Sequence, residues 1–291
     1  MTHEIKNIIQ GYLNARHLGL KCVIATVVDL DGSSYRRPGV RMLINEHGHM
    51  TGAVSGGCVE KEILKQSGSV FESGLPKMMS YDGRYRLGCE GTLYILIELF
   101  APGPGVLEAF ERQIKDRNAF ELISYFSKTH GTNEFWGTQF VFEGNKNYPL
   151  SEKSKLQQTA PDNCKVFSQS LQPCFKLIIV GAEHDAAQLS IMASSLGWET
   201  SVVISPSNPQ NLKDFPGASD LVRSNGDQFD LSRIEKGPAV LLMSHSYVRD
   251  LEFLFTLRET NPADIGVRGP ANRRDRMRQG VGEREPGGED G

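Results

Sequence analysis

The chain has 291 residues and a formal net charge of -3 at pH 7, because 35 Asp and Glu residues outnumber 32 Lys and Arg residues. This length predicts two domains of ordinary size, and the charge excludes a global basic field of the kind that attracts nucleic acid or an anionic membrane. No apolar run approaches the ~20 residues that span a bilayer, and residues 1–6 lack the pattern of a signal peptide. We therefore expect a cytoplasmic protein whose partners are small molecules or proteins.

Cysteine and histidine usage predicts neither disulfides nor a bound metal. The five cysteines form an odd count without a close-spaced pair, and the seven histidines show no HExxH pattern. In a reducing compartment, this spacing disfavours disulfides and zinc or redox sites of the CxxC type. No metal-ligand residues are predicted.

The apolar pattern of residues 1–145 predicts a mixed α/β domain. The expected elements are a helix over 3–18, a buried strand over 20–30, a hairpin of 42–44 and 50–54, a helix from 58, strands over 78–82 and 92–100, a helix over 106–117, and strands over 119–126 and 135–142. The hairpin leads directly into the segment 51–60, a junction of strand, glycine turn and helix. Residues 31–41 are a polar loop with no core pattern.

The glycine turn at this junction offers groups that suit an anion. Gly56 and Gly57 let backbone amides approach a ligand, and the helix N-terminus adds partial positive charge. Cys58 lies at this N-terminus, where the thiolate is favoured, and Glu60 falls in the first helical turn. One interpretation is a binding site with a partly ionised sulfur. The other is an ordinary turn with a small buried cysteine.

Three loops of the first domain carry the candidate ligand-binding residues. They are Ser33, Ser34, Arg36, Arg37 and Gly39 in the first loop, Ser55, Gly56, Gly57, Cys58 and Glu60 in the second, and Gly88 and Cys89 in the third. If the hairpin brings these loops together, arginines, amide donors and soft sulfur would surround a small anionic ligand.

Beyond the first domain, residues 146–173 are polar and predict a linker or a long excursion. Residues 174–278 predict a Rossmann-like, doubly wound parallel sheet. Its expected strands are 175–180, 198–204, 239–243 and 264–267, and its expected helices are 186–196 and 246–260, with a further helix beginning near 270. Residues 279–291 contain almost no apolar side chains and predict a disordered tail.

The second domain departs from the dinucleotide-binding pattern at its first turn. Gly181 is followed by Glu183 where the second glycine of GxGxxG normally permits the pyrophosphate to approach, and the second strand ends at Ser205 without the acid that binds a ribose hydroxyl. Binding of NAD is therefore disfavoured. A pocket near His184 and His245 is one interpretation, and a scaffold without a nucleotide is the other.

Other polar residues of this domain also leave two interpretations open. Ser244 is expected to cap the helix that follows. Five arginines lie around the last strand and the start of the last helix, where they would either clamp a phosphate or form a solvated basic face. They are Arg268, Arg273, Arg274, Arg276 and Arg278.

Several motifs together resemble the XdhC/CoxI family, the accessory factors of molybdenum hydroxylases such as xanthine dehydrogenase. They are Gly32-Ser33-Ser34-x-Arg36-x-x-Gly39-x-x-Met42, Gly52-x-x-Ser55-Gly56-Gly57-Cys58-Val59-Glu60, Leu87-Gly88-Cys89-x-Gly91, Gly181-Ala-x-His184, Ser244-His245 through Asp250, and Ile265-Gly266-x-x-Gly269 followed by Arg273-Arg274. The resemblance covers most of residues 5–278. Glu90 and Glu183 depart from it, since glycine is common at both positions in the family.

The resemblance implies a chaperone that transiently binds the molybdenum cofactor (molybdopterin), a phosphorylated pterin dithiolene, and delivers its sulfurated form. The implied partner is an apo molybdenum hydroxylase similar to xanthine dehydrogenase, in purine metabolism; a cysteine desulfurase and a second copy of the chain are further candidates. Arg36, Arg37 and the amides of Gly56 and Gly57 would then hold the phosphate, with Cys58 and Cys89 near the metal.

Two other functions remain open from the residues alone. One is an NAD(P)-dependent oxidoreductase that uses the second domain, and the other is a protein that relays sulfur between Cys58 and Cys89. The cofactor-insertion factor, a non-catalytic role, is the hypothesis that we favour.

Overall fold

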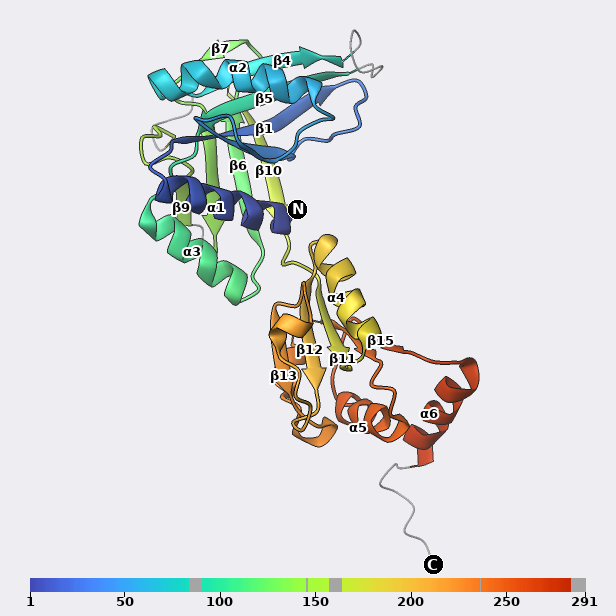
Figure 1. Ribbon diagram of the computed structural model, residues 1–291. Helices are drawn as coiled ribbons and strands as arrows, with labels where there is room; N and C mark the ends of the chain where they lie inside the picture. Colours follow the sequence, from blue (N-terminus) through green and yellow to red (C-terminus); the bar gives the residue numbers. More distant parts are fainter. Residues whose placement is uncertain (84–90, 145, 157–163, 236, 284–291) are drawn as a thin grey trace, which may run out of the picture. The chain divides into compact units, whose positions relative to one another are not determined.

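The computed structural model describes residues 1–83, 91–144, 146–156, 164–235 and 237–283. The chain divides into two compact units, Met1–Pro173 and Cys174–Gly291. The predicted fold class is confirmed: the first unit contains antiparallel sheets with helices, and the second contains a five-stranded parallel sheet (Figure 1).

Within its described residues, the first unit contains two antiparallel sheets and three α-helices. Its elements are α1 (Thr2–His17), β1 (Cys22–Asp31), β2 (Arg41–Asn45), β3 (Met50–Gly52), α2 (Cys58–Ser73), β4 (Lys77–Asp82), β5 (Thr92–Leu99), α3 (Pro104–Lys115), β6 (Phe120–Phe126), β7 (Gly131–Thr132), β8 (Gly137–Phe142), β9 (Lys146–Pro149) and β10 (Lys165–Leu171). The six-stranded sheet has the order β3-β2-β1-β5-β4-β7, and the four-stranded sheet has the order β10-β6-β8-β9.

Strand β1 is apolar along most of its length because both of its faces are covered. Val23 and Ala25 pack in one core cluster with Val59 and Ile63 of α2, whereas Ile24 packs in another with residues of α1, α3 and the four-stranded sheet. Successive side chains of a strand point to opposite faces, so this division follows from the alternation along β1. Helix α2 lies over one face of the six-stranded sheet (Figure 1), and its N-terminus is thereby fixed beside the strand ends.

Buried charges lie among the polar groups of this unit. Arg41 and Glu98 are 5% and 3% exposed. Arg41 donates to the Gly39 carbonyl and to Gln169 Oε1, and Glu98 Oε2 accepts from the Thr138 amide at 2.9 Å. Among the described residues, Glu98 Oε1 has no hydrogen-bond partner. Burial raises the pKa of Glu98 to about 7, although Thr138 and the charge of Arg41 oppose the shift.

The second unit is a doubly wound sheet with the strand order β13-β12-β11-β14-β15, all pairs parallel. Its elements are β11 (Lys176–Val180), α4 (His184–Ser195), β12 (Glu199–Ile204), β13 (Asp220–Arg223), β14 (Ala239–Leu242), α5 (Tyr247–Leu257), β15 (Asp264–Val267) and α6 (Ala271–Glu283), with 3-10 turns at Leu212–Asp214, Gly226–Gln228 and Leu231–Ile234. Helix α4 packs in one core cluster and α5 in the other, on opposite faces of the sheet.

The structure differs from the sequence-based expectations in four segments. The expected linker 146–173 contains β9 and β10, which pair with β8 and β6 and belong to the first unit. No residue of β9 is buried, and one of the two buried residues of β10 is the polar Gln169, so both strands gave a weak apolar signal. Strands β7 and β13 were not predicted, because each is very short or lacks a fully buried residue. The expected tail from 279 continues α6 as far as Glu283.

We expect Glu98→Gln to change how the stability of the first unit depends on pH. Between the ordinary pKa of 4.5 and about 7, the folded state keeps a proton that the unfolded state releases. Stability therefore falls as pH rises through this window, by at most about 1.4 kcal/mol per unit. Glutamine removes this slope. From pH 5 to 7.5, the unfolding free energy of the variant should rise relative to the parent by about 2 kcal/mol.

Urea unfolding followed by Trp136 fluorescence in a Trp198→Phe background reports on the first unit alone, because the chain has two tryptophans. Glu108→Gln, at an exposed position of α3, is the matched control and should leave the slope unchanged. A difference in unfolding free energy between Glu98→Gln and its parent that stays constant across this pH range would contradict the prediction.

Candidate functional site

Two of the three predicted loops line one cavity of the first unit. The cavity has a volume of about 480 Å³ and is lined by Ser34, Tyr35, Arg36, Val54, Ser55, Gly56 and Leu93. Arg36 is the one cation among these described lining residues. Hydroxyls, a backbone turn and apolar side chains complete the wall, so the cavity combines anion-binding groups with an apolar surface.

Close backbone packing holds these loops together. A Cβ atom at Gly91, which follows β4 and the third loop, would lie 2.3 Å from the carbonyl oxygen of Ser33. A Cβ atom at Gly52 would lie 2.8 Å from the carbonyl oxygen of Arg41, and Gly52 has a φ of 84°. Only glycine fits such approaches without a shift of the backbone. Glycines at the loop bases therefore bring the first loop, the 53–57 turn and the start of β5 to one place.

The carboxylate of Glu60 holds the turn before α2 in its conformation. It accepts hydrogen bonds from the amides of Val54 (3.1 Å), Ser55 (2.5 Å) and Gly57 (2.8 Å) and from the hydroxyl of Ser55 (2.5 Å). Burial raises the pKa of this carboxyl, but the hydrogen bonds from Ser55 and from backbone amides outweigh it, so the pKa lies below its ordinary value. Glu60 is 7% exposed and serves the turn itself.

This arrangement changes the roles expected of the two glycines. The Gly57 amide is already bonded to Glu60, so it is not available to an anion, and a φ of 120° explains why glycine is required there. Gly56 lines the cavity, and a Cβ added to it would meet no atom within 4 Å. The absent side chain at Gly56 thus leaves the backbone open to a ligand.

The remaining candidates of the first unit are separated from the cavity or lie outside the described residues. Ser33 and Arg37 are exposed and do not line the cavity. Gly39 packs against Gln169, whose Nε2 a Cβ would approach to 2.3 Å. Cys58 is the first residue of α2, as expected, and its side chain is not described. Gly88 and Cys89 lie outside the described residues.

Sequence reasoning missed the apolar part of the cavity wall. Tyr35 is 89% exposed in the first loop, and Val54 and Leu93 belong to the core cluster beneath α2. Tyr35 sits between Ser34 and Arg36, and this position was a signal that could have identified it. Leu93 had no distinguishing signal, because its place beside Val54 depends on how β5 is registered against its neighbours.

In the second unit, the predicted residues gather at the carboxyl ends of β11, β14 and β15. This is the point at which the strand order reverses, where doubly wound sheets bind ligands. Gly181 follows β11 with a φ of 156°, and a Cβ there would lie 2.7 Å from the carbonyl oxygen of Met243. Glu183 is the N-cap of α4, and His184 is its first residue and is exposed.

His245 belongs to a charged cluster at this edge. Its backbone has a φ of 58°, which is uncommon for a residue other than glycine. Its Nε2 lies 3.2 Å from Asp185 Oδ2 and 2.6 Å from Arg268 Nη1, and Arg268 also pairs with Asp185. A guanidinium can only donate, so His245 Nε2 is the acceptor in its contact with Arg268. The cluster consists of His245, Asp185 and Arg268. His184, the other histidine of the expected pocket, is the residue before Asp185 and is exposed.

A second buried interaction fixes the same edge and corrects two expectations. The carboxylate of Asp250 is fully buried and accepts from the Ser244 amide (3.2 Å), the Ser244 hydroxyl (2.5 Å) and Arg273 Nη2 (2.8 Å). Ser244 therefore does not cap α5; Ser246 does, by accepting from the Arg249 amide. The five arginines of this domain had two interpretations, a phosphate clamp and a solvated basic face; Arg268 and Arg273 are instead engaged in ion pairs within the chain.

The other arginines of that group form no such clamp within the described part of the chain. Arg274 and Arg276 are exposed on α6, and the side chain of Arg278 is not described. Within the described residues, no group of three or more His, Cys, Asp and Glu side chains is placed to hold a metal ion. No described helix has both the length and the apolar character that crossing a membrane requires.

Comparison with known proteins gives consistent matches along the chain. The model of the XdhC and CoxI family matches residues 15–82, and the model of the XdhC Rossmann domain matches residues 177–289. Over 280 residues the chain is 25% identical to a protein of Bacillus subtilis (strain 168) that is named as a probable subunit of xanthine dehydrogenase. That match covers 89% of this chain and 83% of the relative.

Two further relatives extend this picture. The chain is 23% identical over 269 residues to the "Molybdenum cofactor insertion chaperone PaoD" of Escherichia coli (strain K12), with 92% of this chain and 73% of that protein covered. A crystal structure described as a xanthine dehydrogenase from Bacillus halodurans superposes with a TM-score of 0.74 at 24% identity, over 96% of this chain and 86% of that chain. This last likeness shows the fold.

We expect Glu60→Gln to destabilise the first unit by about 2 kcal/mol at pH 7, because an amide replaces a charged acceptor of several hydrogen bonds. The contribution of Glu60 is fully present above the ordinary pKa of 4.5 and is lost as pH falls through the lower folded pKa. The deficit should therefore shrink from pH 5 to pH 3. The matched control is Glu62→Gln, because the Glu62 carboxylate accepts one hydrogen bond, from the Gln66 side chain. This control should lower the free energy of unfolding by less than about 0.5 kcal/mol. Equal urea midpoints for both variants would refute this role.

We expect Asp250→Ala to destabilise the second unit by about 3 kcal/mol, because it leaves the guanidinium of Arg273 without its buried partner. Asp185→Ala removes a more exposed ion pair and should cost under about 1 kcal/mol. Trp198 fluorescence in a Trp136→Phe background follows this unit during urea unfolding. If Asp250→Ala lowers the unfolding free energy no more than Asp185→Ala does, the assignment of Asp250 as the buried partner of Arg273 is contradicted.

Proposed function

Because the chain belongs to the XdhC/CoxI family, we propose that it is an accessory protein that binds the molybdenum cofactor in the first unit and delivers it to a molybdenum hydroxylase. The relative named PaoD, a molybdenum cofactor insertion chaperone, supports this proposal. The observation that carries it is the cavity in which Arg36 lies with Ser55 and Gly56.

The lining chemistry fits a phosphorylated pterin dithiolene. A volume of about 480 Å³ lies within the ordinary range for small-molecule sites. The phosphate would take the guanidinium of Arg36, the hydroxyls of Ser34 and Ser55 and the amide of Gly56, since charged and backbone donors form the strongest bonds to phosphate. The flat pterin would lie against the apolar side chains of Leu93 and Val54.

The turn before α2 contributes pre-organisation to this binding. The Glu60 carboxylate holds the Ser55 and Gly57 amides in place, so the open donor at Gly56 needs no ordering when the ligand arrives. The amide and hydroxyl donors stabilise its negative charge, and the N-terminus of α2 adds positive potential. Cys58 begins this helix, where a thiolate is favoured, and we assign to it the protection of the sulfurated metal.

The second unit has a different role in this proposal. Its edge is occupied by the Asp185–Arg268 and Asp250–Arg273 ion pairs, and Glu183 places a carboxylate at the N-terminus of α4. A carboxylate there opposes a pyrophosphate, so we propose that this unit is a scaffold that does not bind NAD. Titration with NAD(P)H tests this directly. Saturable micromolar binding would favour the alternative oxidoreductase.

We expect the purified protein to bind molybdopterin near one to one and Arg36→Ala to weaken this binding about tenfold to a hundredfold, because a charge-assisted bond to phosphate is lost. Arg37→Ala is the matched control: it removes the same charge from the next position, outside the cavity lining, and should change binding less than about threefold.

Anaerobic titration, in which bound and free molybdopterin are separated and then oxidised to the fluorescent pterin for quantification, measures both constants. Absence of molybdopterin binding by the parent protein would overturn the proposed function. Equal losses in Arg36→Ala and Arg37→Ala would remove the cavity from the binding site, and unchanged binding by Cys58→Ala would remove this cysteine alone.

A further inference from the structure

The six-stranded sheet has an edge that is only partly covered. Strand β4 pairs with β5 along its whole length, from Lys77 to Asp82. On its other side it pairs with the two-residue strand β7 only at Lys77 and Met78. The remainder of β4 has no strand beside it in the described part of the chain. Edges of this kind are usually shortened, covered or paired in folded proteins.

The register identifies the backbone groups that point outward from this edge. The Gly83 amide donates to the Gly91 carbonyl on the β5 side, and the Pro76 carbonyl accepts from the Asn133 amide on the β7 side. Because these directions alternate along a strand, the amide and carbonyl of Ser80 point outward. Ser80 is exposed, and none of its backbone groups bonds to another described residue across this edge.

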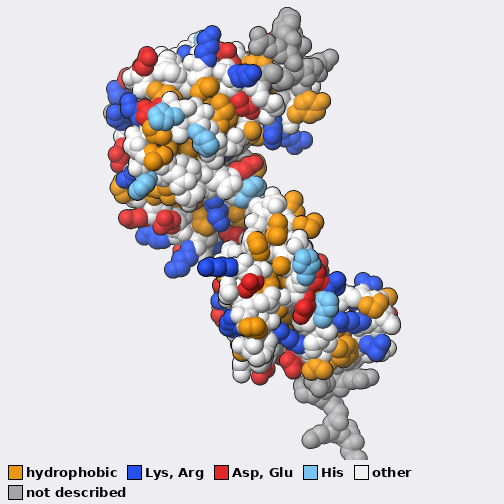
Figure 2. Space-filling model, in the orientation of Figure 1, with side chains coloured by type: hydrophobic (Ala, Val, Ile, Leu, Met, Phe, Trp, Pro, Cys, Tyr) orange, Lys and Arg blue, Asp and Glu red, His pale blue; other side chains and the backbone are white. Residues whose placement is uncertain are grey.

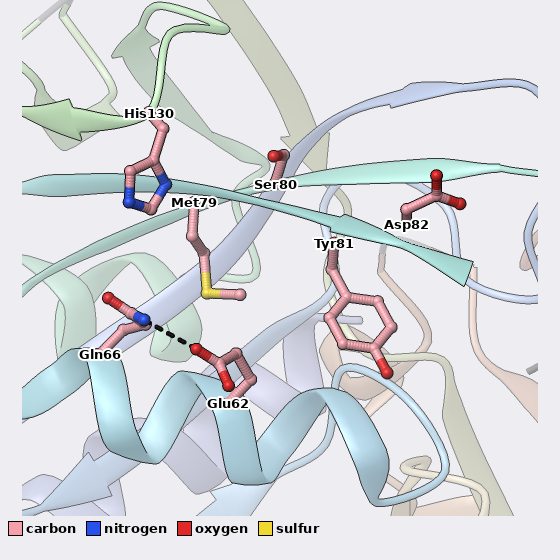
Figure 3. A pocket seen from close by; sticks show the side chains of 7 residues that line it. All are labelled: Glu62, Gln66, Met79, Ser80, Tyr81, Asp82 and His130. Carbon is pink, nitrogen blue, oxygen red and sulfur yellow. Dashed lines mark hydrogen bonds between the residues drawn. The ribbon is translucent and has the colours of Figure 1, made fainter. Parts of the chain in front are cut away.

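A pocket of about 330 Å³ lies along this stretch of β4 (Figure 3). It is lined by Glu62, Gln66, Met79, Ser80, Tyr81, Asp82 and His130. Met79 and Tyr81 point toward α2, whereas Ser80 and Asp82 point away from it (Figure 3). The pocket therefore follows the strand edge, with α2 along one side and His130, just before β7, at one end.

The lining has acceptors and acidic charge, and its described residues include no Lys or Arg. Glu62 and Asp82 supply carboxylates, and Glu62 accepts a bond from Gln66 at 2.7 Å. The hydroxyl of Tyr81 is buried and has no hydrogen-bond partner within the described residues, on a side chain that is 9% exposed. A basic group entering beside Glu62 would meet complementary charge, and a donor would satisfy the Tyr81 oxygen.

We propose that the outer edge of β4 at Ser80 is a docking site for an extended polypeptide segment that carries lysine or arginine side chains. The segment adds as a strand beside Ser80, with its backbone bonded to the Ser80 amide and carbonyl and a basic side chain beside Glu62. Strand addition supplies affinity through the backbone and selectivity through alternate side chains. Figure 2 shows Lys, Arg and acidic side chains interspersed over the visible face of this unit. The acidic lining of the pocket alone selects the basic segment.

This inference goes beyond the proposed cofactor binding and does not depend on it. The cavity that carries the cofactor proposal is lined by residues of the first loop, the 53–57 turn and β5, and it shares no lining residue with the pocket along β4. The two sites are tested with different ligands and different variants, so one can fail while the other stands.

The test measures binding of a fluorescein-labelled eight-residue peptide of alternating threonine and lysine to the full chain by fluorescence anisotropy. The comparison peptide alternates threonine and glutamate. We expect saturable binding of the lysine peptide and at least tenfold weaker binding of the glutamate peptide. High salt should weaken the binding of the lysine peptide, because it screens the partly exposed charge pair between the peptide and Glu62.

Two substitutions at Ser80 separate backbone pairing from side-chain contact. Ser80→Pro removes the outward amide, and proline is tolerated on an edge strand whose N–H faces solvent. Ser80→Pro should therefore weaken the binding of the lysine peptide at least tenfold. Ser80→Ala keeps the amide and is the matched control, with binding within about twofold of the parent. Trp136 fluorescence during urea unfolding checks that each variant remains folded.

A third variant keeps the proposal falsifiable if Ser80→Pro does not fold. Glu62→Gln removes the acidic charge from the opposite side of the pocket without altering the strand. It should weaken the binding of the lysine peptide about fivefold and should not weaken the binding of the glutamate peptide. Three outcomes would overturn the proposal. The first is that the lysine peptide does not bind, and the second is that the glutamate peptide binds as tightly. The third is that folded Ser80→Pro and Glu62→Gln both bind the lysine peptide as tightly as the parent.

Discussion

The arrangement of the first unit depends on one buried carboxylate at the start of α2. Glu60 accepts bonds from three positions of the turn, Val54, Ser55 and Gly57, and so joins the end of the hairpin to the first turn of the helix. Without an acceptor there, the buried amide of Val54 and the part-buried amides of Ser55 and Gly57 would lose their partner, which is costly for a buried donor. The same bonds decide which amide remains for a ligand, because they use Gly57 and leave Gly56 at the cavity wall.

The second unit repeats this device at the strand edge where its fold would bind a ligand. Asp250 accepts from both groups of Ser244 and from Arg273, and thereby connects the end of β14 to α5 and α6. Charged groups that might have bound a phosphate are used within the chain. In both units a buried acid orders a strand-to-helix turn, and in the first unit a cavity with a cation on its wall lies beside this turn.

The proposed ligand site and the proposed docking site have separate places on the first unit. Both sites adjoin the six-stranded sheet, which α2 covers on one face. Leu93, which lines the cavity, is paired across strands with Tyr81, which lines the pocket along β4. Yet their chemistry differs: one combines a cation and hydroxyls with apolar side chains, and the other combines carboxylates with an unpaired strand edge. A protein that receives a small anionic cargo and transfers it to a second protein needs surfaces of both kinds.

The sequence by itself determined the fold class, the order of the main elements, the family and the candidate loops. Apolar alternation and helical spacing are local signals, and glycine with Ser34, Arg36 and Ser55 marks unusual loops. Only the tertiary structure decided that Glu60 occupies the Gly57 amide, that Leu93 joins the cavity, that β9 and β10 belong to the first unit, and that Ser80 lies at an open edge. Each of these depends on which strands pair and on contacts between distant residues. Periodicity along the chain indicates which side chains share a face, but it does not identify the pairing partner of a strand or the distant residues that meet.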